Sequence, residues 1–109
     1  MGFALTGLRY ALRSENSAKT QFLVFVGVVV ALIVVRPEPL WWALVVLASA
    51  GVLAAELFNT AVEHLADHLH PEVHPSIRVV KDCAAAAVLV ASLGAVGVGV
   101  ALVVHLLAR

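Results

Sequence analysis

Residues 83–104 read CAAAAVLVASLGAVGVGVALVV, an apolar run interrupted only by Ser92. A membrane span needs about 20 helical residues at a rise of about 1.5 Å each, so this run can cross a bilayer without help from its neighbours. Two shorter apolar runs, 22–35 and 40–55, precede it, and adjoining helix-compatible residues can complete both. The sequence therefore predicts an all-α membrane protein. Its three transmembrane helices are expected at residues 16–35, 40–69 and 77–107.

The amino-acid composition supports this prediction. Of the 109 residues, 62% are hydrophobic and only 13% are charged, whereas about 25% are charged in soluble domains. A chain of this length has room for one domain, residues 1–109. The net charge is zero and the basic residues form no dense patch, which argues against nucleic acid as a partner. The single cysteine, Cys83, excludes an internal disulfide and a zinc site built from cysteines.

The prolines and basic residues predict the turn between the first two spans and the orientation of the chain. The residues Arg36-Pro37-Glu38-Pro39 predict a tight turn, because each proline disfavours helix at the residue before it. Three spans place the N-terminal segment and the second connection on one side, which carries most of the basic residues and is cytoplasmic by the positive-inside rule. We therefore expect a multi-pass protein of the bacterial inner membrane with its N-terminus in the cytoplasm. The basic residues on that side are Arg9, Arg13, Lys19, Arg78 and Lys81, with Arg36 and Arg109 opposite.

Residues 1–15 are predicted to form a surface helix ahead of the first span. Within 3–13, three leucines recur on one helical face and two arginines lie on the other, which is typical of a helix lying in the membrane interface. The sequence leaves open whether this helix is only an anchor or also forms part of an active site. The residues are Leu5, Leu8, Leu12, Arg9 and Arg13.

Four oxygen-bearing side chains gather at the cytoplasmic end of the second span. At 100° per residue they lie within about 80° of one another, so they form one stripe that begins where the apolar run ends. Their oxygens are ligands that Mg²⁺ prefers, and a carboxylate beside the bilayer is a functional candidate. The alternative is a solvated helix end whose acids only face water. This set, the polar stripe, comprises Glu56, Asn59, Glu63 and Asp67.

Further polar residues are expected near this stripe. Lys81 can extend to the interface, but Asp82 beside it has no such reach and needs a partner or a cation. The alanines at 84–87 allow close helix packing, so this Lys-Asp pair can stand against the polar stripe. Glu15 adds a carboxylate at the same membrane boundary. Small residues at every fourth position further along predict a helix packing seam: Ala87, Ala91, Ala95 and Gly99.

Two segments together resemble a known family. The pattern Glu-x-x-Asn-Thr-Ala-x-Glu-x-x-x-Asp occupies residues 56–67, and a His-Pro loop and Lys-Asp-x-Ala-Ala at 81–85 follow. This arrangement closely resembles the prokaryotic diacylglycerol kinase family, which includes the undecaprenol kinases of Gram-positive bacteria. The resemblance extends over essentially the whole chain. Neither a Gly-x-x-x-x-Gly-Lys-Ser/Thr loop nor a Gly-x-Ser-x-Gly element occurs.

That resemblance implies a homotrimeric lipid kinase with active sites at the cytoplasmic interface, shared between subunits. It implies transfer of the γ-phosphate of ATP, with Mg²⁺, to the hydroxyl of a membrane lipid, either undecaprenol or diacylglycerol. Glu56 would be the general base, and Glu15 and Glu63 the metal ligands. Residues implied to contact ATP are Glu15, Glu63, Glu72, Val73, His74, Lys81 and Asp82. Supporting or substrate contacts would come from Arg9, Asn59 and Asp67.

The residues themselves agree with this division, with two departures from the family. Glu56 lies deepest, and removal from water makes a carboxylate a stronger base. Residues 16–21 differ from the usual family pattern, and residues 84–87 are all alanine where relatives place a glycine or serine, so lipid fit is expected to differ. The loop Pro-Glu-Val-His-Pro at 71–75 resembles the undecaprenol kinase branch, which favours a polyprenol acceptor.

Two other functions remain open from the sequence. One is a transporter or metal-handling protein, since histidine and aspartate residues at helical spacing can hold zinc or a di-metal centre. The other is a structural membrane subunit, which predicts no use for the Lys-Asp pair or for Glu15. The residues of the metal-handling alternative are His64, Asp67, His68 and His70.

Overall fold

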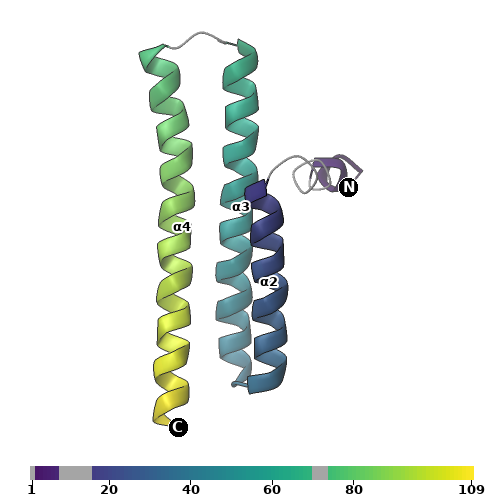
Figure 1. The fold of residues 1–109 in the computed structure, drawn as a ribbon, viewed down its shortest axis with the longest axis vertical. Coiled ribbons are helices and arrows are strands. Elements are labelled where there is room, and N and C mark those ends of the chain that lie inside the picture. Colours follow the sequence, from purple (N-terminus) through teal and green to yellow (C-terminus); the bar gives the residue numbers. More distant parts are fainter. Residues whose placement is uncertain (1, 8–15, 70–73) are drawn as a thin grey trace.

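The structure, a computed structural model, describes residues 2–7, 16–69 and 74–109. Within these ranges the chain is helical except at the turn 36–38 and at two helix-flanking residues, and it contains no strand. Three long helices follow one another as an up-and-down bundle (Figure 1). They are α2 (Asn16–Val35), α3 (Pro39–Leu69) and α4 (Pro75–Ala108).

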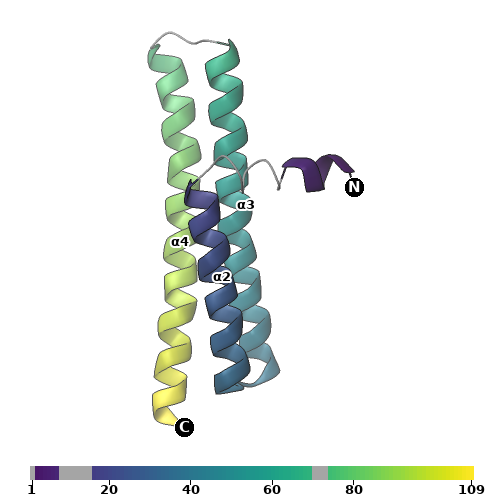
Figure 2. The same ribbon diagram turned by 45° about the vertical axis from the view of Figure 1, so that its right-hand side comes forward.

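Residues 2–7 form a short helix that lies crosswise to the bundle, at the height where α2 begins (Figure 2). This helix falls within the predicted surface helix at 1–15, and the remainder of that segment lies outside the described residues. The bounds of α2 are those predicted for the first span. α3 begins one residue before its predicted start, and α4 begins two residues early and ends one residue late.

The turn between α2 and α3 forms where the two prolines predict it. Arg36 has φ 53°, in the left-handed region, and its N–H donates to Leu32 O at 2.9 Å, which closes the end of α2. This position usually carries glycine, because a side chain there is strained. Pro37 is buried in the turn, and Pro39 begins α3, where the N–H that proline lacks would have had no helical partner.

The start of α4 differs from the prediction. The predicted start at residue 77 makes Ser76 the cap, whereas the N-cap is His74, whose Nδ1 accepts a hydrogen bond from Ser76 N–H at 3.1 Å. Pro75 occupies the first helical position, where its fixed φ suits the helix. A histidine cap is uncommon, and the preference of serine for the cap position misplaced the boundary by two residues.

α3 lies in the middle of the bundle and packs against both other helices, while no Cα of α2 comes within 8 Å of a Cα of α4. At about 1.5 Å per residue, α2 is about 30 Å long, α3 about 46 Å and α4 about 51 Å. One turn joins α2 to α3, and α2 is the shorter of the two. The upper parts of α3 and α4 therefore extend as a pair beyond the N-terminal end of α2 (Figure 1). The molecule measures 55 × 30 × 21 Å.

Very little of the apolar surface is buried within one chain. The exposed surface is 7778 Å², whereas a compact soluble protein of 11.4 kDa exposes about 5,800 Å². Among the described residues, α4 has no fully buried residue although it is the most apolar span. Such a surface is stable against lipid or other chains and not against water. The buried residues are Leu32, Pro37, Val45, Val52 and Ala66.

Two helices, α3 and α4, are long and apolar enough to cross a membrane. The described apolar part of α2, Lys19–Val35, is shorter than a full span. The predicted all-helical architecture is thus confirmed for the described residues. The third span at 16–35 stays a prediction.

Candidate functional site

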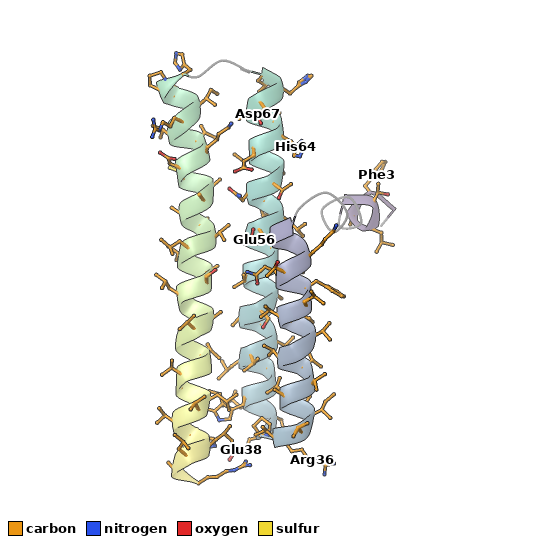
Figure 3. All side chains as sticks on the ribbon, in the orientation of Figure 1. Phe3, Arg36, Glu38, Glu56, His64 and Asp67 are labelled. Carbon is orange, nitrogen blue, oxygen red and sulfur yellow. The ribbon has the colours of Figure 1, made fainter. Side chains whose placement is uncertain are left out.

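The polar stripe lies on α3, which continues as a single helix beyond the end of α2. The same turn joins α2 to α3, and the 20 residues of α2 extend alongside α3 as far as about residue 58. The stripe therefore begins at the level of the N-terminal end of α2. Figure 3 shows Glu56 beside the upper end of α2 and Asp67 near the upper end of α3. Glu56, Asn59 and Glu63 are half-buried, and Asp67 is exposed. The structure therefore brings all four into one line along the helix axis.

Lys81 of α4 closes the upper end of the stripe. Its Nζ lies 2.5 Å from Asp67 Oδ1, in an ion pair that is also a hydrogen bond donated by the ammonium. The prediction that Lys81 stands against the polar stripe is confirmed. Its neighbour Asp82 is exposed and makes no hydrogen bond or ion pair in the described part of the chain. Of the Lys-Asp pair, Lys81 is thus the member that the fold directs toward α3.

Asn59 carries a buried oxygen without a partner. Among the residues that the structure describes, its Oδ1 is the one buried side-chain polar atom that makes no hydrogen bond. Such an atom costs free energy, and it is found in native proteins where a ligand, a water or another chain completes the site. Glu63 lies one helical turn above Asn59 and one turn below Asp67, so the orphan oxygen belongs to the middle of the stripe.

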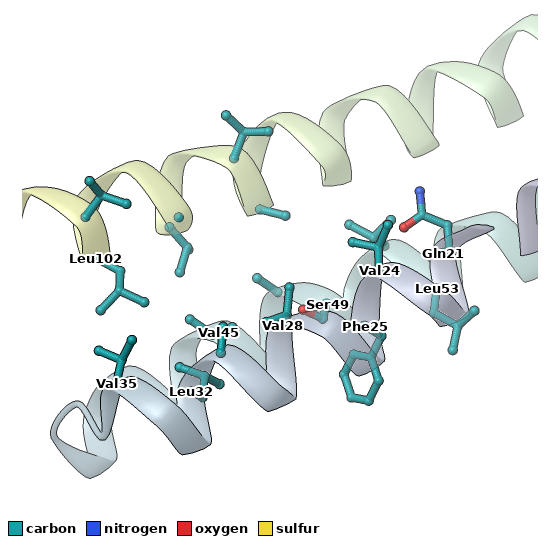
Figure 4. Close-up of a pocket in the computed structure, with 18 of the residues that line it drawn as sticks. Gln21, Val24, Phe25, Val28, Leu32, Val35, Val45, Ser49, Leu53 and Leu102 are labelled. Atoms are coloured by element: carbon teal, nitrogen blue, oxygen red, sulfur yellow. The ribbon is translucent and has the colours of Figure 1, made fainter. Parts of the chain in front are cut away.

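An apolar groove leads to the stripe. It has a volume of about 490 Å³ and lies between α2 and α4, with α3 as its floor. Figure 4 shows Val28 and Val35 of α2 and Leu102 of α4 on its walls. The groove is apolar except at Gln21 and Ser49.

The floor of the groove is the same face of α3 that carries the polar stripe. Its lining residues on α3 are Val45, Ala48, Ser49, Val52 and Leu53. At 100° per residue these positions lie on the side of the helix occupied by Glu56 and Glu63, about one to three turns below Glu56 and about three to five turns below Glu63. The groove therefore ends directly beneath Glu56.

Sequence reasoning missed this groove because the spacing of small residues was interpreted as a packing seam. Ala95 and Gly99 line the groove, and a Cβ added at Gly99 would meet no atom within 4 Å. At these two positions the small residues therefore face the groove and do not bring two backbones of this chain together. The packing seam stays a prediction at Ala87 and Ala91.

Several predicted site residues fall outside the described residues: Arg9, Glu15, His70, Glu72 and Val73. His74 is described and caps α4. Among the described residues no group of three or more His, Cys, Asp and Glu side chains is arranged to hold a metal ion. His64 and His68 are exposed on α3, and Asp67, the third described member of the metal-handling alternative, pairs with Lys81.

Comparison with known proteins places the sequence among lipid kinases. Residues 2–103 match the family described as prokaryotic diacylglycerol kinase. The chain is 34% identical over 98 residues to a diacylglycerol kinase of Synechocystis sp., covering 89% of this chain and 56% of that protein. It is 30% identical over 84 residues to an undecaprenol kinase of Bacillus subtilis, covering 77% of this chain and 68% of that protein. The chain thus spans little more than half the length of the first of these relatives.

Proposed function

Because the chain belongs to the prokaryotic diacylglycerol kinase family, we propose that it is a lipid kinase that transfers the γ-phosphate of ATP to the hydroxyl of a membrane lipid. The observation that carries this proposal is the junction of the apolar groove and the polar stripe on one face of α3. A lipid alcohol has the same two parts, an apolar chain and one reactive hydroxyl. The groove would hold the hydrocarbon part of the lipid, and the polar stripe would receive its hydroxyl.

The size of the groove is consistent with such a substrate. A volume of about 490 Å³ lies within the range of roughly 300 to 1,000 Å³ typical of small-molecule sites. The acceptor would be undecaprenol or diacylglycerol, the two lipids in the relatives' names. We favour the polyprenol, because the Pro-Glu-Val-His-Pro loop at 71–75 is of the undecaprenol kinase type.

The proposed setting is the bacterial inner membrane, crossed by α2, α3 and α4. The length of α2, about 30 Å, equals the usual thickness of the hydrocarbon core. Arg78 and Lys81, at the end of the bundle that carries the polar stripe, then lie on the cytoplasmic side, as the positive-inside rule requires. The helix at residues 2–7 would lie on the membrane surface, and its Phe3, 96% exposed, offers a side chain for insertion.

In the proposed reaction Glu56 is the general base. It accepts the proton of the lipid hydroxyl while the hydroxyl oxygen attacks the γ-phosphorus of ATP. A new P–O bond forms to the lipid, the bond to the β–γ bridging oxygen breaks, and ADP leaves. Glu56 suits this role because it is half-buried on α3, about one helical turn above the last α3 residues that line the groove.

The cationic partner of the phosphates is proposed to be Mg²⁺ together with Lys81. Magnesium keeps several waters and phosphate oxygens as ligands and needs only one or two protein carboxylates. Glu63, half-buried between the orphan oxygen of Asn59 and the ion pair of Asp67, fits this requirement. We propose Glu15 as the second ligand, and the bound ion would neutralise charge on the phosphates. Further ATP contacts are proposed for Glu72, Val73, His74 and Asp82, and supporting contacts for Arg9.

We further propose that the active protein is a homotrimer with sites shared between subunits. Above Glu56 the polar stripe extends past the N-terminal end of α2 and has only α4 beside it among the long helices. A single chain therefore encloses this part of the stripe on one side. The exposed apolar surface also exceeds that of a compact monomer by about one third. A neighbouring chain would complete the enclosure.

The test is phosphate transfer by the purified protein in phospholipid, with labelled ATP and magnesium, and with undecaprenol and diacylglycerol offered in competition. We expect labelled lipid phosphate, mostly on undecaprenol. Glu56→Gln should lower the rate at least about 100-fold, because general bases contribute about 10²- to 10⁴-fold. Glu38→Gln, which removes a carboxylate at the opposite end, should leave the rate unchanged. Transfer to neither lipid, or full activity of Glu56→Gln, would contradict the proposal.

A further inference from the structure

The ion pair between Asp67 and Lys81 joins the two helices where they extend past α2. It links residues 14 positions apart, across the connection between α3 and α4. The Lys81 side chain is 38% exposed and that of Asp67 is 63% exposed. Pairs this open to water stabilise a fold little, because solvent screens the charges and two long side chains lose freedom. The pair is therefore poorly explained by a contribution to folding.

Its geometric effect on Lys81 is larger. The lysine side chain is a flexible stem of four carbons, so an ammonium without a partner samples a wide volume. The carboxylate of Asp67 takes one of its three N–H donors and holds the nitrogen beside α3. Asp67 lies one helical turn above Glu63, so the two remaining donors are held at the upper end of the polar stripe, about one helical turn from Glu63.

We propose that Asp67 is a positioning residue, which sets the affinity for magnesium-ATP by holding the ammonium of Lys81 where the phosphates bind. This inference rests on the proposed kinase function. Asp67 itself touches neither phosphate nor lipid in this account. Its effect passes through Lys81, so it acts on nucleotide binding and leaves the proton transfer at Glu56 alone.

The experiment is a double-mutant cycle read as KM for ATP and kcat. Asp67→Asn should raise KM for ATP roughly threefold to fivefold, the upper part of the range expected for an exposed ion pair, with kcat changed less than about twofold. Asp67→Glu, which keeps the charge, should recover part of the loss. In a Lys81→Met background, Asp67→Asn should cause no further rise in KM, since the group that it positions is gone. Glu38→Gln is the control for loss of a carboxylate.

The outcomes separate this inference from the function on which it rests. A wild-type protein that phosphorylates neither lipid overturns both. An active wild type with unchanged KM in Asp67→Asn overturns the positioning role alone. A lower KM in Asp67→Asn also overturns it, because Asp67 would then compete with ATP for Lys81. Equal effects of Asp67→Asn in both backgrounds overturn it as well, since the effect would not pass through Lys81.

Discussion

The two ends of the helical bundle use their polar side chains differently. At the end formed by the turn 36–38, polar groups complete the backbone: Arg109 Nη2 donates to Val35 O at 3.3 Å, which satisfies a carbonyl at the end of α2. Nearby, the rings of Trp41 and His105 lie 5.4 Å apart and join α3 to α4. We call this the turn end. Its contacts link all three helices and leave little for a ligand to complete.

At the opposite end of the bundle, the polar side chains are less fully satisfied by contacts within the chain. It holds an unpartnered buried oxygen on Asn59, an exposed ion pair at Asp67, and two half-buried glutamates, all within the described residues. We call it the stripe end. Polar groups at the turn end complete the backbone, whereas at the stripe end the Asn59 oxygen is unfavourable for the fold and the exposed ion pair contributes little to it. The comparison teaches that stability and function are separated along the length of α3.

After the loss expected for Glu56→Gln, the largest effect comes from matched carboxylate changes at the two ends. Glu63→Gln should lower activity by about 10- to 100-fold and raise the magnesium concentration needed for half-maximal rate, because loss of a metal ligand weakens metal binding. Glu38→Gln at the turn end should leave both quantities unchanged. The measurement is the transfer rate against magnesium concentration at saturating ATP. Equal effects of the two substitutions would remove the distinction between the ends.

A second prediction separates stability from activity at one residue. Asn59→Leu replaces the orphan oxygen with a methyl group, which should raise the stability of the protein by about 1 kcal/mol. The same change should lower lipid phosphorylation at least about tenfold, since the oxygen is kept at a cost to folding. The measurements are the midpoint of thermal unfolding in one detergent and the transfer rate. A lower midpoint would show that Asn59 has a structural partner after all.

The smallest expected effect concerns the turn end. Trp41→Leu should lower stability by about 0.5 to 1.5 kcal/mol more than Trp42→Leu, because only Trp41 has a ring contact in the described part of the chain. Both tryptophans are half-buried near the same helix start, so the second variant controls for loss of an interfacial ring. Both variants should retain wild-type transfer rates once folded. Loss of activity in Trp41→Leu alone would mean that the turn end also serves the reaction.

The order, length and boundaries of the helices follow from local features of the chain. Apolar runs of sufficient length and two pairs of prolines place the boundaries of the three long helices within two residues, because proline acts on its immediate neighbours. The polar stripe is equally local, since residues 56, 59, 63 and 67 share a face of any α-helix that contains them. The family motif runs through these same residues, which is why candidate site residues could be named before the fold was known.

Contacts between helices depend on the three-dimensional packing. α2 and α4 are apolar around most of their circumference, so no stripe in the sequence marks which face meets a neighbour. Tertiary packing leaves these two helices apart and opens the groove beneath Glu56. It also selects Asp67 as the partner of Lys81 and leaves Asp82 exposed. Periodicity places residues on a face of one helix, whereas partners on two helices are decided by how those helices pack.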